Sequence, residues 1–160
     1  MSSNARRLAE IERLYRARFP QFLRVAWAIT GDREQALDAV QEGFAGAIRS
    51  RRTLRRDSSL EPWLWRAVVN ASRDRRRAPA DTLDDAPESA AGNGRVEGSA
   101  ARVAIAALPE RQRLVVFLRY YADLDYRSIG DALGIATGTV SATLNAAHRT
   151  LRQTLQEVER

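Results

Sequence analysis

The strongest constraint on the fold is a short helix, a tight glycine turn and a longer helix, all encoded within residues 125–158. Asp125 has the side chain of a helix N-cap, and Gly134 stands where a helix closes with positive φ. The short helix is expected over 126–133, with a buried face at Ile129, Ala132 and Leu133. Thr137 has the chemistry to cap the second helix. Because the turn is so short, the second helix should pack at a steep angle and protrude far enough to enter a DNA major groove.

The second helix carries an apolar stripe at three- and four-residue steps, formed by Val140, Leu144, Ala147, Leu151, Leu155 and Val158. Residues 100–108 begin the same module, and Pro109 suits the first turn of a further helix. The predicted buried residues of that helix are Leu114, Val115, Phe117, Leu118 and Tyr121. Three packed helices are a common small core and do not by themselves indicate DNA binding. The function of this module must therefore be inferred together with the rest of the chain.

The composition removes most catalytic chemistries. All 26 basic residues are arginine, which excludes phosphate-loop, Schiff-base and kinase-type lysines. The chain has no cysteine and a single histidine, His148, so thiolate nucleophiles, disulfides and histidine-rich metal clusters are excluded as well. A hydrolase built from a serine, His148 and an aspartate is disfavoured, because His148 lies within a predicted helix and no nucleophile-elbow turn is present. We therefore expect no enzyme activity, no metal and no cofactor.

Charge is distributed in blocks along the 160 residues. Residues 1–80 hold 17 arginines and 9 acidic residues, a balance of +8, whereas residues 81–100 hold 1 arginine and 5 acidic residues, a balance of −4. Residues 101–160 hold 8 arginines and 6 acidic residues, a balance of +2. Two basic blocks indicate a polyanionic partner. No stretch has the apolar core of a signal peptide or the length of a membrane span, so a cytoplasmic protein with no membrane partner is expected.

Helical periodicity predicts an N-terminal domain over residues 1–77 and a C-terminal domain over residues 101–160. In the first domain, helices are expected at 5–19, 21–30, 33–49 and 60–77. Pro20 should separate the first two, Asp32 and Gln35 should form a capping box, and Ser58 or Ser59 should cap the last. Residues 78–100 are rich in Pro, Gly, Ala, Ser and acids and should form a flexible linker. The expected fold class is all-α, with two small helical domains of which the second is a helix-turn-helix.

The helix expected at 60–77 ends in four closely spaced cations, Arg73, Arg75, Arg76 and Arg77. Cations in a last turn complement the helix dipole, but four of them exceed that need. We therefore predict that this cluster contacts DNA phosphates and is the main electrostatic anchor of the protein on DNA.

Four segments in order resemble the successive signatures of extracytoplasmic-function sigma factors, the minimal two-domain sigma subunits of bacterial RNA polymerase. These segments are ALDAVQEGFAGAIR, PWLWRAVVNASRDRRR, LPERQRLVVFLRYY and LDYRSIGDALGIATGTV. The resemblance covers nearly the whole chain except the expected linker. It implies binding to core RNA polymerase, through the clamp of the β′ subunit and the β flap, and binding to promoter DNA. An anti-sigma factor is a typical further partner of the family.

The resemblance also implies roles for single residues. The residues matching the family's clamp-docking surface are Asp38, Gln41 and Glu42, which share the polar face of one predicted helix. The residues matching the segment that opens the downstream promoter element and captures a flipped base are Arg55, Arg56, Asp57, Ser58, Trp63, Trp65, Arg66, Asn70 and Arg73. Unstacked bases need aromatic surfaces and the backbone needs cations, which this set supplies. At least one tryptophan should belong to the core, and either ring is a candidate for DNA contact.

The expected recognition helix departs from the family pattern, because Ser141, Ala146 and His148 stand where cations are usual. The residues placed to contact the upstream −35 element are Thr137, Thr139, Ser141, Thr143, Asn145, His148 and Arg149. Fewer cations mean fewer phosphate contacts and a weaker salt dependence. Two functions therefore stay open. The first is a sigma factor that directs polymerase to promoters and initiates transcription. The second is a sigma-like regulator with weakened DNA contacts that acts through protein–protein interaction.

Overall fold

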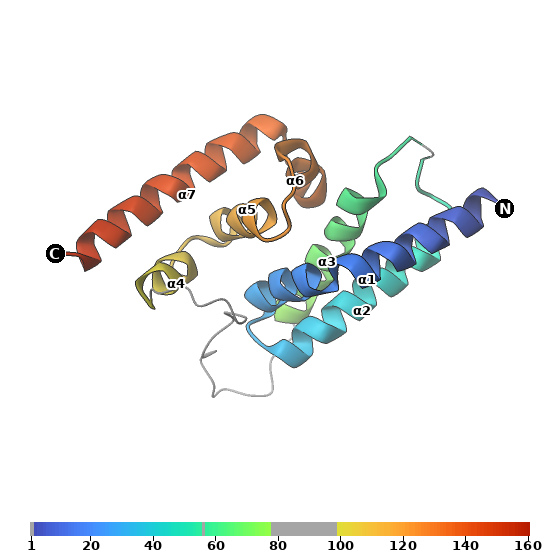
Figure 1. Cartoon of the computed structure of the whole chain (residues 1–160), viewed down its shortest axis with the longest axis horizontal. Helices are drawn as coiled ribbons and strands as arrows, with labels where there is room; N and C mark the ends of the chain where they lie inside the picture. Colours follow the sequence, from blue (N-terminus) through green and yellow to red (C-terminus); the bar gives the residue numbers. More distant parts are fainter. Residues whose placement is uncertain (1, 56, 78–98) are drawn as a thin grey trace.

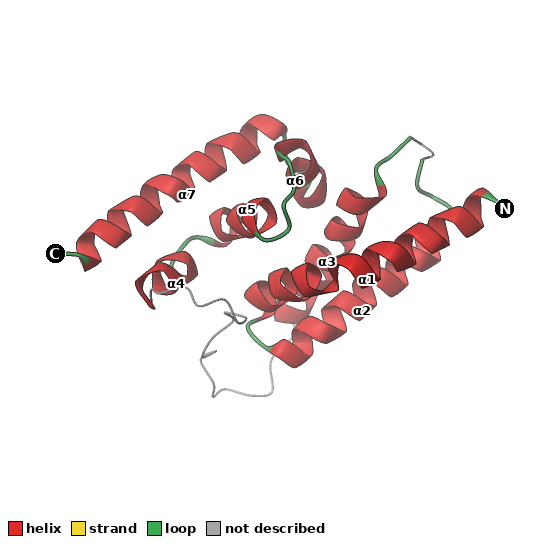
Figure 2. Ribbon diagram, in the orientation of Figure 1, coloured by secondary structure: helices red, strands yellow, loops and turns green. Residues whose placement is uncertain are grey.

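The structure, a computed structural model, describes residues 2–55, 57–77 and 99–160, with only the backbone described for residues 77 and 99. Within these ranges every regular element is an α-helix, and the helices gather into two groups (Figures 1 and 2). The first group is α1 (Ser3–Thr30), α2 (Arg33–Ser50) and α3 (Leu60–Arg77). The second is α4 (Ser99–Ala106), α5 (Glu110–Tyr120), α6 (Tyr126–Leu133) and α7 (Thr137–Val158). The predicted all-α fold is confirmed, while the linker expected at 78–100 lies almost entirely outside the described residues.

α1 runs without interruption from Ser3 to Thr30, so the predicted break at Pro20 is wrong. A proline within a helix removes one hydrogen bond and costs about 3 kcal/mol. Here Pro20 is exposed, and the helix buries apolar side chains on both sides of it, at Ile11 and Leu14 before and at Phe22 and three others after. The burial of one continuous apolar face outweighs the local cost.

Aromatic rings fill the centre of the first group. The Trp65 ring stacks on Phe22 with a centroid distance of 3.9 Å, and Phe44 meets the edge of Phe22 at 4.9 Å. Tyr15 adds a further edge contact to Phe44 at 5.0 Å. These rings come from α1, α2 and α3, so the three helices share one core. This core holds the surfaces of α2 and α3 at fixed positions.

α2 and α3 approach closely at Gly43. A Cβ atom on this glycine would lie 2.9 Å from the Cα atom of Val68, a separation that real Cβ atoms do not tolerate. The two helices run antiparallel from this point, because Ser50 and Trp63 lie toward one end of the pair and Gln35 and Arg75 toward the other. Asp32 caps α2, as predicted, by accepting a hydrogen bond from the Gln35 N–H, whereas the Gln35 side chain accepts from Arg75 instead of completing the predicted capping box.

The predicted helix-turn-helix is present as α6 and α7. The Asp125 carboxylate accepts the Ser128 N–H at 2.7 Å, and this hydrogen bond is the main cause of a lowered Asp125 pKa. Gly134 closes α6 at a φ of +69°, also as predicted. The predicted cap of α7 is wrong, because Ala136 occupies the N-cap position without a side-chain bond and Thr137 is the first helical residue. The N-terminus of α7 therefore lacks the side-chain cap that Asp125 gives to α6.

The buried stripe of α7 is shorter than the sequence pattern. Val140, Leu144 and Ala147 are buried, whereas Leu151 is half-buried and Val158 is 60% exposed. In α5 the buried set is Leu114, Val115, Val116 and Leu118, and the predicted Phe117 and Tyr121 stack on each other at its half-buried edge. Pro109 is the N-cap of α5 rather than a first-turn residue.

The two groups of helices touch each other, chiefly through α3 against α6 and α1 against α5. Arg18 of α1 donates to the Ala122 carbonyl oxygen and pairs with Glu61 at 3.3 Å. The guanidinium of Arg24 lies over the Tyr121 ring, 4.8 Å from its centroid. Arginines of the N-terminal group therefore contribute to the contact between the groups, beside an apolar core to which both groups supply buried residues.

Candidate functional site

An acidic face lies along the first half of α2. Asp38 and Glu42 are four residues apart, so they project from one side of the helix, and Gln41 is exposed beside them. Their side chains are half exposed, at 47% for Asp38 and 54% for Glu42. Arg75 of α3 reaches across to both, with Nε 3.1 Å from Glu42 Oε2 and Nη1 3.4 Å from Asp38 Oδ2. The acidic face thus includes a cation that the sequence did not assign to it.

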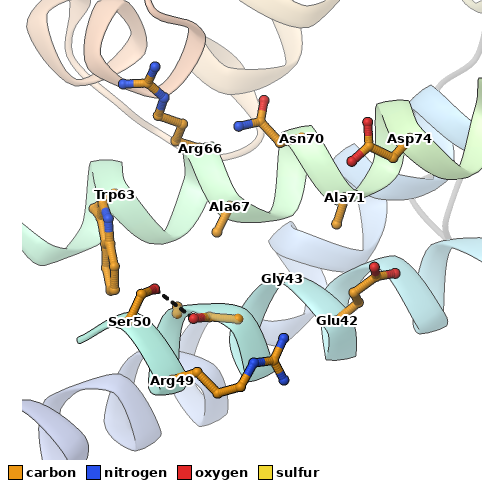
Figure 3. Close-up of a pocket in the computed structure, with 12 residues that line it drawn as sticks. Glu42, Gly43, Arg49, Ser50, Trp63, Arg66, Ala67, Asn70, Ala71 and Asp74 are labelled. Carbon is orange, nitrogen blue, oxygen red and sulfur yellow. Dashed lines mark hydrogen bonds between the residues drawn. The ribbon is translucent and has the colours of Figure 1, made fainter. Parts of the chain in front are cut away.

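An open groove of about 500 Å³ lies between α2 and α3 (Figure 3). Its floor is made of small residues, and its rim is polar and mixed in charge. The lining residues are Glu42, Gly43, Gly46, Ala47, Arg49, Ser50, Trp63, Arg66, Ala67, Asn70, Ala71 and Asp74. Figure 3 shows Ala67 and Ala71 pointing from α3 toward α2, whereas Arg66 and Asn70 point away from α2 at the rim. The groove therefore combines an apolar floor with hydrogen-bonding groups at its edge.

The two tryptophans of α3 have separate positions. Trp65 is fully buried and stacks on Phe22, so its ring belongs to the core and is not available to a base. Trp63 is partly buried and lines the end of the groove, where its ring extends toward Ser50 (Figure 3). The sequence expectation that one ring must be core is met by Trp65. Trp63 is the aromatic surface that remains for a ligand.

The cations of α3 are bound within the chain. Arg73 and Arg76 both pair with Glu110 of α5, at 3.4 Å and 2.9 Å, and the hydrogen bond from Arg76 is the main cause of a lowered Glu110 pKa. The Arg66 guanidinium lies beside Gly134 at the turn between α6 and α7. These residues were expected to face phosphates, and in this arrangement they also connect the two groups of helices. The side chain of Arg77 lies outside the described residues.

The segment between α2 and α3 carries the remaining candidates of the N-terminal group. Arg55, Asp57 and Ser58 are exposed, and the Ser58 N–H donates to the Arg55 carbonyl oxygen at 3.2 Å. Arg56 lies outside the described residues. Arg55, Asp57 and Ser58 lie in the chain between Ser50 and Trp63, which line one end of the groove, but they are not themselves part of its lining.

On α7, two of the predicted DNA-contacting side chains are tied back to the protein. The Thr143 hydroxyl donates to the Thr139 carbonyl oxygen at 2.7 Å, and His148 Nε2 hydrogen-bonds to the Tyr120 hydroxyl at 2.9 Å. Asn145 and Arg149 are exposed on the side of the helix opposite its buried stripe. Thr137 and Thr139 are exposed at its N-terminal end, and Ser141 is half-buried.

Sequence reasoning missed the small residues that form the groove. Gly43, Gly46 and Ala47 on α2 face Ala67 and Ala71 on α3. Small residues repeated at three- and four-residue spacing on both helices were the available signal, because they allow two backbones to approach. The contacts of Glu110 and Gln35 with arginines of α3 were not predicted either, because nothing in the local sequence indicates these distant partners.

Within the described ranges, no group of three or more His, Cys, Asp or Glu side chains is placed to hold a metal ion. None of the described helices is both long and apolar enough to cross a membrane.

Comparison with known proteins gives consistent matches for both halves. Residues 14–81 match the family model described as Sigma-70 region 2, and residues 104–153 match that described as Sigma-70, region 4. The ECF RNA polymerase sigma factor SigM of Mycobacterium tuberculosis is 34% identical over 152 residues, which cover 90% of this chain and 76% of SigM. RNA polymerase sigma factor SigV of Bacillus subtilis is 26% identical over 136 residues, covering 82% of each chain.

Two solved structures share the fold. The sigma factor RpoE in complex with the anti-sigma factor NepR from Bartonella quintana superposes with a TM-score of 0.72 at 20% identity, covering 94% of this chain and 99% of that one. CnrH in complex with the cytosolic domain of CnrY gives a TM-score of 0.72 at 18% identity, covering 96% and 95%.

The matched segments fall on the N-terminal helices and on the helix-turn-helix group, which defines a two-domain protein of the sigma-70 type. The chain belongs to the extracytoplasmic-function family of RNA polymerase sigma factors. It is an alternative sigma factor that binds core RNA polymerase and initiates transcription at promoter DNA, and it carries out no catalysis itself.

Proposed function

We propose that the acidic face of α2 docks on the clamp of RNA polymerase while the groove between α2 and α3 holds an unstacked base of the non-template strand. The observation that supports this proposal is the composition of the groove. It offers an aromatic ring at Trp63, an apolar floor, and the Asn70 amide and Arg66 guanidinium at its rim. A flipped base needs a stacking surface, a pocket and hydrogen-bond partners for its edge. The neighbouring acidic face would hold the polymerase directly beside the melted DNA.

The exposed segment before α3 supports the same path for the DNA. Arg55 and Ser58 are exposed in the segment that connects the two helices of the groove, and they would supply a cation and a hydroxyl for the backbone of a single strand. Electrostatic contacts to phosphates fix register without selecting sequence, so the groove would supply the selectivity. Arg56 and Arg77 are further candidates from the sequence.

For the C-terminal group we propose contact with the upstream −35 element through the N-terminal half of α7. Thr137 and Thr139 are exposed at the N-terminus of the helix, which has no side-chain cap and whose dipole favours a phosphate. Asn145 is exposed for hydrogen bonds to a base edge, and Arg149 for a phosphate. Since Thr143 and His148 already have partners in the protein, they are weaker candidates. The β flap is the proposed polymerase contact of this group.

The proposal places the protein in the cytoplasm, where bacterial RNA polymerase meets promoter DNA. An anti-sigma factor is a proposed partner, since both structures that share the fold are complexes, one with NepR named as an anti-sigma factor and one with the cytosolic domain of CnrY. The poor set of cations on α7 favours a second candidate role, a regulator that binds polymerase but makes weak DNA contacts.

Charge reversal of the acidic face tests the docking proposal. Replacing Asp38 and Glu42 by arginine should abolish capture of core polymerase and run-off transcription, because the surface would then repel the cationic partner that carboxylates attract. The matched control replaces Glu10 and Glu12, which are exposed on α1, with the same change in net charge. Helicity is measured for both variants. Unchanged capture by a folded Asp38/Glu42 variant would remove the docking assignment, while capture without promoter-specific transcripts from the native chain would favour the regulator.

A further inference from the structure

Arg75 is held by the side chains of three α2 residues. Its Nε donates to Glu42 Oε2 at 3.1 Å, and its Nη1 lies 3.0 Å from Gln35 Oε1 and 3.4 Å from Asp38 Oδ2. Residues 35, 38 and 42 recur at three- and four-residue steps, so they form one row on the surface of α2. A single planar guanidinium spans this row, which is the fork geometry that arginine provides and lysine does not.

The neighbouring arginines Arg73 and Arg76 of α3 point away from this row of α2 residues. Successive residues of an α-helix point about 100° apart, so Arg75 and Arg76 cannot face the same partner. Arg76 donates to Glu110 of α5 at 2.9 Å, and Arg73 pairs with the same carboxylate. Arg75 is therefore directed toward the two carboxylates of α2, and Arg73 and Arg76 toward the single carboxylate of α5.

We propose that Arg75 is a positioning residue of the polymerase-docking surface rather than a phosphate anchor, and that it holds the carboxylates of Asp38 and Glu42 in the orientation that polymerase binds. This inference rests on the proposed docking by α2. Arg75 contacts one oxygen of each carboxylate, Oδ2 and Oε2. A carboxylate has two oxygens and several lone pairs, so the second oxygen of each group can accept a donor from the partner.

The benefit of this arrangement lies in binding rather than in folding. All three side chains are partly exposed, with Arg75 at 30%, and ion pairs of this kind contribute little to stability. Glutamate has several rotatable bonds, and ordering it when a partner binds costs free energy. A guanidinium that already fixes Glu42 removes this cost from the docking step. Net charge on the row remains negative after pairing, since two carboxylates face one cation.

The test measures core-polymerase affinity for Arg75→Ala, Arg75→Lys and the control Arg76→Ala, each with its helicity and unfolding midpoint. Arg75→Ala should weaken core binding by about fivefold, the effect of leaving one flexible side chain to be ordered on binding. Arg75→Lys should recover part of the loss, since it restores the charge without the fork, and Arg76→Ala should bind core polymerase normally. In the Glu42→Gln background, Arg75→Ala should cost less core affinity than it does in the native chain, because one of the two carboxylates that Arg75 orients is already absent. The salt dependence of promoter binding by the Arg75→Ala holoenzyme should equal that of the native holoenzyme.

Each other outcome overturns the proposal in a recognisable way. Unchanged core affinity with weaker and less salt-dependent promoter binding would make Arg75 a phosphate anchor. Tighter core binding by Arg75→Ala would mean that Arg75 competes with polymerase for the carboxylates. If reversal of Asp38 and Glu42 leaves core binding intact, the docking surface itself is wrong. If that reversal abolishes binding and Arg75→Ala has no effect, only the positioning role is wrong.

Discussion

Trp63 and Trp65 are two residues apart on α3, yet they have opposite environments. The Trp65 ring is enclosed by Phe22 and the rest of the aromatic core, and its loss would leave a large cavity. Trp63 lies at the end of the groove with part of its ring accessible. A substitution at one position therefore tests stability, and the same substitution at the other tests the groove.

Replacing Trp63 by alanine should reduce transcription from duplex promoters while leaving the domain folded, since the groove would lose its stacking surface. On a template with a pre-melted start region, most of the activity should return, because the strand is already open. Replacing Trp65 by alanine should instead destabilise the N-terminal bundle by about 3–5 kcal/mol, the usual cost of removing a buried aromatic side chain. Denaturant unfolding and run-off transcription on both templates measure these effects. Equal activity of the native chain and Trp63→Ala on duplex DNA would exclude Trp63 from base capture.

At the residue scale, the sequence predicted local chemistry well and distant partners poorly. Asp32, Asp125 and Gly134 act where they were predicted, because a cap or a left-handed turn depends on neighbours along the chain. Arg75 was assigned to phosphate on charge alone. Its partners lie 33 to 40 residues earlier, and only the packing of α2 against α3 brings them together.

At the scale of elements, the close approach of α2 and α3 depends on Gly43, and Gly46 one turn later provides a matched comparison. A Cβ on Gly43 would meet the backbone of Val68 at 2.9 Å, whereas a Cβ on Gly46 would meet only the end of the Arg49 side chain at 3.7 Å. Gly43→Ala should therefore force the helices apart and destabilise the protein by about 1–3 kcal/mol, as overpacking does. Gly46→Ala should stabilise it by up to about 1 kcal/mol, because alanine is the better helix former. Thermal unfolding of the two variants measures both effects, and similar midpoints for both would contradict the close packing at Gly43.

Helix positions followed from the sequence wherever one local signal dominated. The bounds of α3 and α6 agree with the predicted ranges. The exceptions are places where packing outweighs local preference. Pro20 is accommodated within α1 because residues on both sides of it share one buried face, and Ala136 takes the cap position expected for Thr137 because the turn after Gly134 is one residue shorter.

For the whole molecule, the sequence predicted two domains and gave no sign of the contacts between them. Glu110 binds two of the arginines proposed to face DNA, and Arg66 lies against the turn of the helix-turn-helix. These contacts join residues from two blocks that both carry a net positive charge, so the charge distribution along the sequence gave no indication of them. Whether each domain folds alone remains a proposal, which fragments spanning 1–77 and 101–160 would test.

Neutralising Glu110 should loosen the contact between the two groups of helices. In the Glu110→Gln variant the pairs with Arg73 and Arg76 lose their charge, so the mean separation of the groups should increase and the freed cations should bind DNA more tightly. The chain has no cysteine, so Ala17→Cys and Gln153→Cys, both at exposed positions, allow two dyes to report the separation by energy transfer. Asp131→Asn, which removes one exposed acid of α6, is the control for net charge. Unchanged energy transfer in Glu110→Gln would show that the apolar contacts of α3 with α6 maintain the arrangement without the ion pairs.

The same dye pair gives a pH test with a definite sign. The hydrogen bond from Arg76 lowers the Glu110 pKa from its ordinary value of 4.5, so the contact favours the ionised carboxylate. The ionised Glu110 carboxylate therefore contributes fully to the contact at a pH above its ordinary pKa. This contribution is lost only as the pH falls through the lower pKa that Glu110 has in the folded protein. Energy transfer should therefore stay constant between about pH 7.5 and about pH 5.5 and decrease only below the ordinary pKa of a glutamate. In Glu110→Gln this decrease should be smaller, because the group that takes up the proton is absent. A decrease that is already complete above about pH 5.5 in the native chain would remove Glu110 as the determinant of the contact.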